Sequence, residues 1–110
     1  FSLHGALVPP ATTLLLHDAA RRGLVAMVDF LLTTLMVDVN VKGRQGMTAL
    51  QFAARSGKTI MVQHLLATAS PDLTVADDLG QTAWQAAKAN NKEEIVVLLE
   101  QYDAASSKQE

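Results

Sequence analysis

The segment that decides the fold is Gly46-Met47-Thr48-Ala49-Leu50-Gln51-Phe52-Ala53-Ala54-Arg55-Ser56-Gly57, because much of it recurs at an offset of 34 residues on both sides. Toward the C-terminus, Gly46, Thr48, Gln51 and Ala53 recur as Gly80, Thr82, Gln85 and Ala87, and Val62 beyond the segment recurs as Val96. Toward the N-terminus, Leu50, Ala53, Ala54 and Gly57 recur as Leu16, Ala19, Ala20 and Gly23, and Met61, Leu65 and Leu66 beyond the segment recur as Met27, Leu31 and Leu32. A constant period of this length is typical of repeat proteins, in which each unit buries its apolar face against its neighbours.

The composition indicates one soluble domain. The 110 residues suit a single domain, and 49% hydrophobic against 18% charged residues is too apolar for a disordered tail. No window offers the ~20 uninterrupted apolar residues of a membrane span, because Asp29 interrupts the best candidate, residues 24–37. A net charge of −2 argues against general nucleic-acid binding.

Cysteine is absent, which excludes disulfides and thiolate metal sites and is expected of a protein in the cytoplasm or nucleus. Residues 1–8 lack the basic start and long apolar run of a signal peptide. Phe1 stands where an initiator methionine would be, so we expect a segment of a longer protein, monomeric or part of that longer chain.

The chain divides into an extension, three repeat units and a tail. Pro9-Pro10 excludes a helix running through residues 1–13, which we expect to lie across the exposed side of the first unit, unless they are disordered. The units span residues 14–47, 48–81 and 82–102, and residues 103–110 form a polar, frayed tail. Apolar spacing predicts helices at 14–22, 25–34, 49–56, 59–68, 83–90 and 92–101, with hairpin-like loops at 38–47 and 72–80.

Each helix pair needs a tight link and close packing. Gly23 and Gly57 end the first helix of their units, and Asn91 takes this place in the third, because Asn is the non-glycine residue that best tolerates a positive φ. The small residues Ala19, Ala53 and Ala87 allow close helix contact, whereas Leu16, Leu50 and Trp84 are expected to fill the space between layers. Met27 and Met61 are predicted to lie in the core, and Met47 to be exposed.

These residues resemble the ankyrin repeat, whose pattern is Gly-x-Thr-Pro-Leu-His-x-Ala-Ala, a later glycine, paired leucines and an Asp-Val-Asn loop start. The middle unit matches through residues 46–54, Gly57 and Leu65-Leu66. The first matches through Leu16-His17-Asp18-Ala19-Ala20, Gly23, Leu31-Leu32 and Asp38-Val39-Asn40, and the third through Gly80, Thr82, Trp84, Ala87 and Leu99. The resemblance covers about residues 14–102 and implies an all-α solenoid of helix-turn-helix units joined by hairpin-like loops.

The departures from this pattern carry further expectations. The family's proline is replaced by Ala49 and Ala83, and its histidine by Gln51 and Gln85, which we expect to bond across to the backbone of the neighbouring loop. The family's glycine after the second helix is missing, with residues 35–37 and 69–71 in its place, so an irregular link is expected there. The third unit has the acidic surface of a terminal cap.

The sequence offers little for catalysis. No nucleophile motif surrounds any serine, and the resemblance assigns His17 a structural place. His64, beside Leu65-Leu66, is expected to be packed or in solvent. His17 and Asp18 are adjacent on a helix and point about 100° apart, without a third ligand at suitable spacing, so no metal is expected. We expect no cofactor and no enzymatic activity.

Charged residues suggest where a partner binds. The resemblance places all four arginines on the concave side, with Lys42 and Lys58 beside them in sequence. The third unit holds Asp77 and Asp78 instead, which predicts a groove that is basic at its first two units and acidic at its last. Helix ends also collect charge, and arginine near a helix C-terminus interacts favourably with the dipole. The predicted partner-binding residues are Arg21, Arg22, Arg44, Gln45, Met47, Arg55, Ser56, Asp78, Leu79, Gln81, Ala89 and Asn90.

The resemblance implies a non-catalytic module that recognises a protein or peptide, and the arginines favour an acidic or phosphorylated one, because arginine forks onto carboxylate or phosphate. Two alternatives remain open. The chain could be a docking or regulatory domain of a larger enzyme or scaffold in the same polypeptide. It could also be a structural spacer that packs through the apolar edge at residues 35–37.

Overall fold

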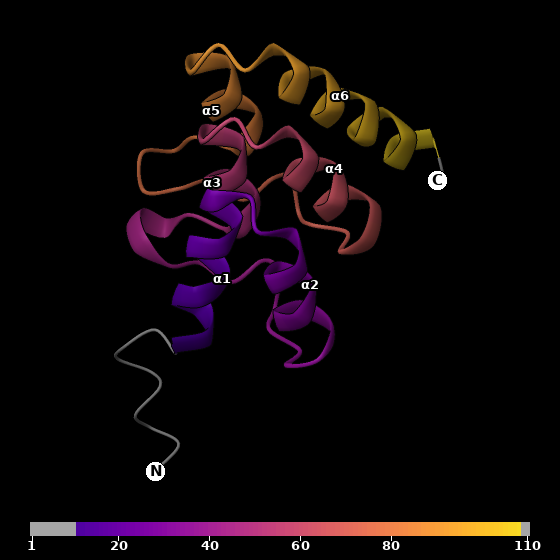
Figure 1. The fold of residues 1–110 in the computed structure, drawn as a ribbon. Coiled ribbons are helices and arrows are strands. Elements are labelled where there is room, and N and C mark those ends of the chain that lie inside the picture. Colours follow the sequence, from indigo (N-terminus) through magenta and orange to yellow (C-terminus); the bar gives the residue numbers. More distant parts are fainter. Residues whose placement is uncertain (1–10, 109–110) are drawn as a thin grey trace.

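The computed structural model describes residues 11–108, which form a stack of three helix pairs (Figure 1). The helices are α1 (Ala11–Arg22), α2 (Val25–Thr33), α3 (Ala49–Arg55), α4 (Thr59–Thr68), α5 (Ala83–Ala89) and α6 (Glu93–Lys108). The 3-10 turn η2 (Arg44–Gly46) lies between α2 and α3. The described residues contain no strand, which confirms the predicted all-α solenoid.

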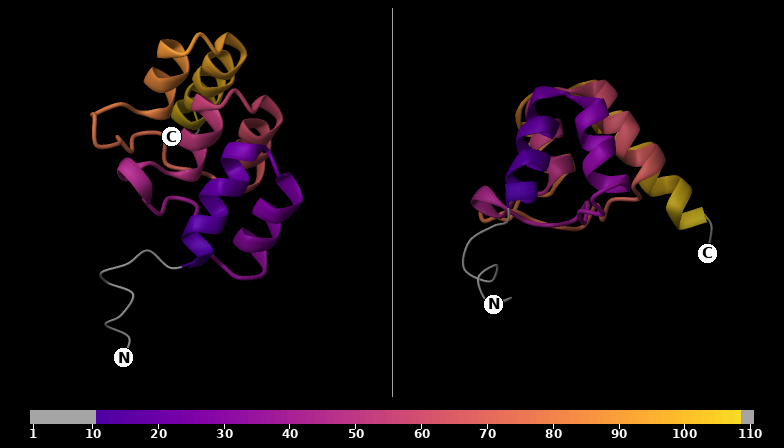
Figure 2. Two further views of the ribbon diagram at one scale, coloured as in Figure 1. Left: turned by 60° about the vertical axis from the view of Figure 1, so that its left-hand side comes forward. Right: turned by 60° about the horizontal axis from the view of Figure 1, so that its bottom comes forward.

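The helices lie in two layers. Helices α1, α3 and α5 are stacked in the first layer, and α2, α4 and α6 make up the second (Figures 1 and 2). Helix α3 contacts both α1 and α5, and each first-layer helix packs against the second-layer helix that follows it. The loop after each of α2 and α4 returns to the start of the next unit, so that loop tips and first-layer helices share one face of the molecule (Figure 2).

The recurring Thr-x-x-Gln pattern starts the first-layer helices. At α3, the Thr48 N–H donates to Gln51 Oε1 at 2.7 Å, and the Gln51 N–H donates back to Thr48 Oγ1 at 3.4 Å. Thr82 and Gln85 make the same reciprocal pair at α5, with distances of 2.9 and 3.3 Å. Both are capping boxes, which satisfy backbone donors that a helix start leaves unpaired.

Residues with positive φ close each helix pair as predicted. Gly23, Gly57 and Asn91 have φ of 79°, 73° and 59°, and they occupy equivalent places in the three units. The irregular links expected after the second-layer helices are also present, because Met36 and Ser70 have φ of 58° and 49°. Met36 and Ser70 therefore adopt the left-handed backbone conformation, which is uncommon for residues other than glycine.

The loops are tied to the helices and to one another. The Gln51 Nε2 group donates to the carbonyl oxygens of Val75 and Gln81 at 3.1 and 3.0 Å, which confirms the predicted bond to the neighbouring loop. The backbone N–H of Asp78 donates to the Gln45 carbonyl at 3.0 Å and thereby joins successive loop tips. Glutamine therefore takes over the stapling role that the resemblance gives to histidine.

The core runs through both layers and includes Leu16, Leu50 and Met61, as expected. Trp84 is only partly buried but packs against this core. The prediction for Met27 is wrong, because its side chain is 43% exposed; α2 turns Val28 and Leu31 inward instead. Val28 and Leu31 are equivalent to Val62 and Leu65, which are buried in α4, so the two helices keep the same register and only Met27 differs from Met61.

The first and last helices are longer than predicted. Helix α1 begins at Ala11 rather than Leu14, and α6 continues to Lys108 through residues expected to fray. Ala104 and Ala105 explain the second difference, since alanine has the highest helix propensity. Residues 1–10 and 109–110 lie outside the described part of the chain, and with them the predicted path of Phe1, Leu3, Leu7 and Val8.

Candidate functional site

A pocket of about 560 Å³ lies where α1, α3 and the η2 loop tip meet, and we call it the basic pocket. Its apolar part is made by Leu14 and Leu15, which are 44% and 50% exposed, together with Phe52 from the next unit. Arg21 and Arg44 line it from α1 and from η2. The remaining lining residues are Ala11, His17 and Asp18. The pocket therefore combines an apolar surface, shared by the first two units, with two guanidinium groups from the helix and the loop of the first unit.

The charge at this site is not fully balanced. Asp18 accepts hydrogen bonds from both Arg21 and Arg22, the latter at 3.3 Å. The bond from Arg21 lowers the pKa of Asp18, with a further contribution from Arg22, so this carboxylate stays ionised at neutral pH. No carboxylate in residues 11–108 forms an ion pair with Arg44. The pocket thus keeps a positive charge that an anionic group could neutralise.

His17 forms the inner wall of the pocket and is held on two sides. Its Nε2 atom lies 3.1 Å from the Val41 carbonyl oxygen, and its ring stacks on Phe52 with centroids 5.1 Å apart. Burial lowers the pKa of His17, although the Val41 carbonyl opposes the shift. The buried Nδ1 atom has no hydrogen-bond partner among the described residues, which fits a neutral ring with the proton on Nε2. His17 therefore acts as a structural staple.

The described residues contain no group of three or more His, Cys, Asp or Glu side chains that could hold a metal ion. His64 Nε2 lies 3.4 Å from Asp29 Oδ1, on the second layer of helices and away from the residues that line the basic pocket. Across residues 11–108, no helix is both long and apolar enough to cross a membrane.

Comparison with known proteins identifies the repeat. The family described as ankyrin repeats matches residues 16–109 in three copies. The chain belongs to the ankyrin-repeat family. Its helix pairs, loops and stacking described above are those of an ankyrin-repeat protein-interaction domain, and the search of curated proteins found no match.

The ankyrin-repeat domain is also similar to a solved structure. A chain in the structure of the complex between the Bd0816 predatory endopeptidase from Bdellovibrio bacteriovorus and immunity protein Bd3460 matches with a TM-score of 0.74 and 30% identity. The match covers 80% of the present chain and 45% of that chain, so this ankyrin-repeat domain spans less than half of its length.

The structure brings only two of the predicted binding residues, Arg21 and Arg44, into the basic pocket of the ankyrin-repeat domain. Several others are exposed at helix ends or loop tips but do not line it: Arg22, Gln45, Arg55, Ser56, Asp78, Leu79, Ala89 and Asn90. Gln81 is partly buried, and its carbonyl is used by Gln51. The predicted site is therefore a broad face, of which the basic pocket is one part.

The prediction that Met47 is exposed and contacts a partner is wrong. Its side chain is only 3% exposed. The physical reason is its extended backbone, whose carbonyl accepts a hydrogen bond from the Gly43 N–H at 3.0 Å. This bond closes the loop over η2, so the tip is formed by Arg44 and Gln45, and Met47 already belongs to the packed start of α3.

Sequence reasoning missed Phe52, Leu14, Leu15 and Asp18 as members of the site. Phe52 occupies the same repeat position as Asp18 and Ala86, and this position differs in all three copies. Variation between copies was therefore the signal that could have identified it. Leu14 and Leu15 gave no such signal, because apolar helix residues are normally assigned to the core.

Proposed function

We propose that this ankyrin-repeat domain binds a segment of a partner protein through the basic pocket. The observation that carries the proposal is that Arg21 and Arg44 line one pocket with the exposed side chains of Leu14 and Leu15 and with the partly buried Phe52 of the next unit. An acidic or phosphorylated side chain would pair with the guanidinium groups, and an apolar neighbour would cover the leucines. The domain itself performs no chemistry.

Two observations support binding of a protein partner by a pocket that is already formed in the free domain. The pocket lies on helices α1 and α3, and the loop that carries Arg44 is held by the hydrogen bond between His17 and Val41, so little of the pocket needs to be ordered when a partner binds. The similar chain in the complex of an endopeptidase with an immunity protein also supports a protein as partner. A cytoplasmic or nuclear location fits the absence of cysteine.

Selection from a library of random octapeptides, with and without one fixed phosphoserine, tests this function. We expect enrichment of Asp, Glu or phosphoserine beside a large apolar residue, because both halves of the pocket are then covered. Binding of the selected peptides should weaken as salt increases, since an exposed ion pair is screened. Enrichment of Lys and Arg, or no enrichment over beads without protein, would contradict the proposal.

A further inference from the structure

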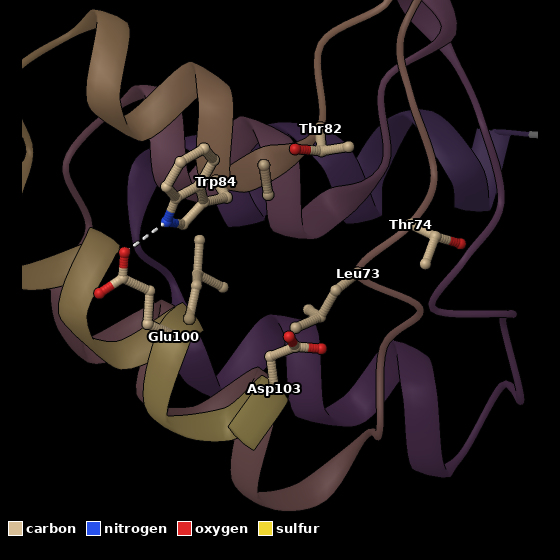
Figure 3. A pocket seen from close by; sticks show the side chains of 8 residues that line it. Leu73, Thr74, Thr82, Trp84, Glu100 and Asp103 are labelled. Atoms are coloured by element: carbon tan, nitrogen blue, oxygen red, sulfur yellow. Dashed lines mark hydrogen bonds between the residues drawn. The ribbon is translucent and has the colours of Figure 1, made fainter. Parts of the chain in front are cut away.

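A second pocket, of about 530 Å³, lies at the far end of the stack, and we call it the C-terminal slot (Figure 3). Its apolar part consists of Leu73 from the loop before α5, Ala83 and Trp84 at the start of α5, and Leu99 from α6. Glu100 and Asp103 form its α6 side (Figure 3). It lies apart from the basic pocket, with which it shares no lining residue.

In the second unit, the corresponding place is filled by the chain itself. The residues 34 positions before Ala83, Trp84 and Leu99 are Ala49, Leu50 and Leu65, and all three are buried. The loop that leads to α5 runs past them, and its Val75 and Gln81 carbonyls accept hydrogen bonds from Gln51. An extended loop segment with an apolar side chain and a free carbonyl is thus what this kind of surface binds.

A bond from a first-layer helix side chain to a carbonyl of the neighbouring loop also occurs in the first unit, but the third unit has no such bond within residues 11–108. His17 contacts the Val41 carbonyl of the loop leading to α3. Gln85 is the equivalent residue of α5, and its Oε1 atom accepts the Thr82 N–H within the capping box. Its amide nitrogen donates to no residue within 11–108. Gln85 therefore presents a donor at the position from which the other units hold their neighbouring loop.

Helix α6 continues through the positions at which the other units turn into the next loop. After α2 and α4, the chain turns at Met36 and Ser70, both of which have positive φ. The equivalent residue Ala104 remains helical, and Ala105 stands where Pro71 stops the second unit. Helix α6 consequently projects beyond the ends of α2 and α4 and carries the chain away (Figures 1 and 2).

Charge adds a preference for the occupant. Glu100 Oε2 accepts the Trp84 indole N–H at 3.0 Å, which fixes this carboxylate beside the slot. Asp103 is exposed on the next turn of the helix. The Lys88 Nζ atom lies 4.6 Å from the centre of the Trp84 ring but does not line the slot. A basic side chain on the occupant would therefore meet two carboxylates.

We propose that the C-terminal slot binds an extended segment of a different protein, in the manner of the loop of a following repeat. One main-chain carbonyl accepts from the Gln85 amide, an apolar side chain lies between Leu73, Trp84 and Leu99, and a Lys or Arg faces Glu100 and Asp103. This site is separate from the basic pocket and prefers the opposite charge.

The test uses a peptide copied from residues 70–76 of this chain with Asp72→Lys, and the fluorescence of Trp84, the single tryptophan. We expect a saturable change in emission at peptide concentrations up to about 1 mM, as for a weak short-peptide complex. A scrambled peptide of the same composition should give no saturable change. Absence of saturation, or equal binding of the scrambled peptide, would overturn the proposal.

Gln85→Glu isolates the proposed donor, because glutamate keeps the Oε1 acceptor of the capping box but has no N–H group. We expect three- to tenfold weaker peptide binding despite the added negative charge, with binding restored in Gln85→His. Circular dichroism confirms that each variant is folded, and Gln63→Ala, on the exposed side of α4, is the control. Unchanged binding by folded Gln85→Glu would contradict the proposal.

Two further measurements distinguish the C-terminal slot from the basic pocket and from self-association of the chain. Arg21→Ala with Arg44→Ala should leave this peptide's binding unchanged, so failure of the slot and failure of the basic pocket are distinguishable. Light scattering without peptide should give a mass that does not change with concentration. If the mass rises and the Trp84 signal follows it, a second copy occupies the slot and the proposal is wrong.

Discussion

His17 is held by Val41 and Phe52 in the neutral state, and this has a consequence for stability at acidic pH. Burial lowers the pKa of His17 in the folded protein, whereas the unfolded chain has a normal histidine. The unfolded state therefore binds a proton first as pH falls, and stability is lost below about pH 6.5. Above that pH the contribution is fully present.

We predict that the free energy of unfolding falls between pH 7.5 and 5.5, by no more than about 1.4 kcal/mol from this group. His17→Gln should remove this part of the pH dependence, because glutamine makes the same bond in the next unit without titrating. Urea unfolding at several pH values measures it. Equal slopes for the wild type and His17→Gln would contradict the explanation.

Single residues also show where sequence reasoning reaches its limit. The positive φ of Asn91 could be predicted, because its place in the repeat requires what Gly23 and Gly57 supply. The burial of Met47 could not, since it depends on the turn at Gln45, whose φ of 59° brings the chain back early. Phe52 could have been recognised from its variation between copies, but its stacking on His17 is a contact between units.

Gln51 and Gln85 are the same residue at the same place in two units, which allows a matched measurement. Gln51 caps α3 and also staples the next loop through Val75 and Gln81. Gln85 caps α5 only, within the described chain. The difference in stability between the two alanine variants therefore reports the loop staple.

We predict that Gln51→Ala lowers the free energy of unfolding by about 2–4 kcal/mol, since two loop carbonyls lose a buried donor. Gln85→Ala should cost about 0.5–2 kcal/mol, the value of a helix cap. Urea unfolding of both variants, followed by circular dichroism, measures the two values. An equal loss in the two variants would show that the staple contributes nothing beyond the cap.

The bounds of a helix agree with the prediction where the sequence contains a residue that stops the helix, and they differ from the prediction where it does not. Helix α4 has the predicted bounds, because Gly57 and the residues before Pro71 mark its ends. Helix α6 extends further than expected, since the polar composition of residues 103–108 suggested a tail although Ala104 and Ala105 favour helix. Only the stack shows that this extension leaves the C-terminal slot open.

The molecule as a whole is a short ankyrin-repeat stack with two pockets, for which we propose opposite charge preferences. The basic pocket lies between the first two units, and the C-terminal slot lies at the third. The sequence predicted a basic first part and an acidic last part, and the structure resolves the first of these into one pocket formed by Arg21 and Arg44. The apolar share of that pocket, from Leu14, Leu15 and Phe52, required the stacked units to be seen together.

Recognition through the basic pocket is tested by the affinity of an acidic peptide for the Arg21→Ala, Arg44→Ala double variant. The peptide is the best binder from the library selection, labelled for fluorescence anisotropy. The account predicts at least about tenfold weaker binding, because each charge-assisted bond contributes about 1.5–3 kcal/mol. Arg55→Ala, exposed but outside the pocket, should bind within about twofold of the wild type. Unchanged affinity of a folded double variant, or an equal loss in Arg55→Ala, would contradict recognition by the basic pocket.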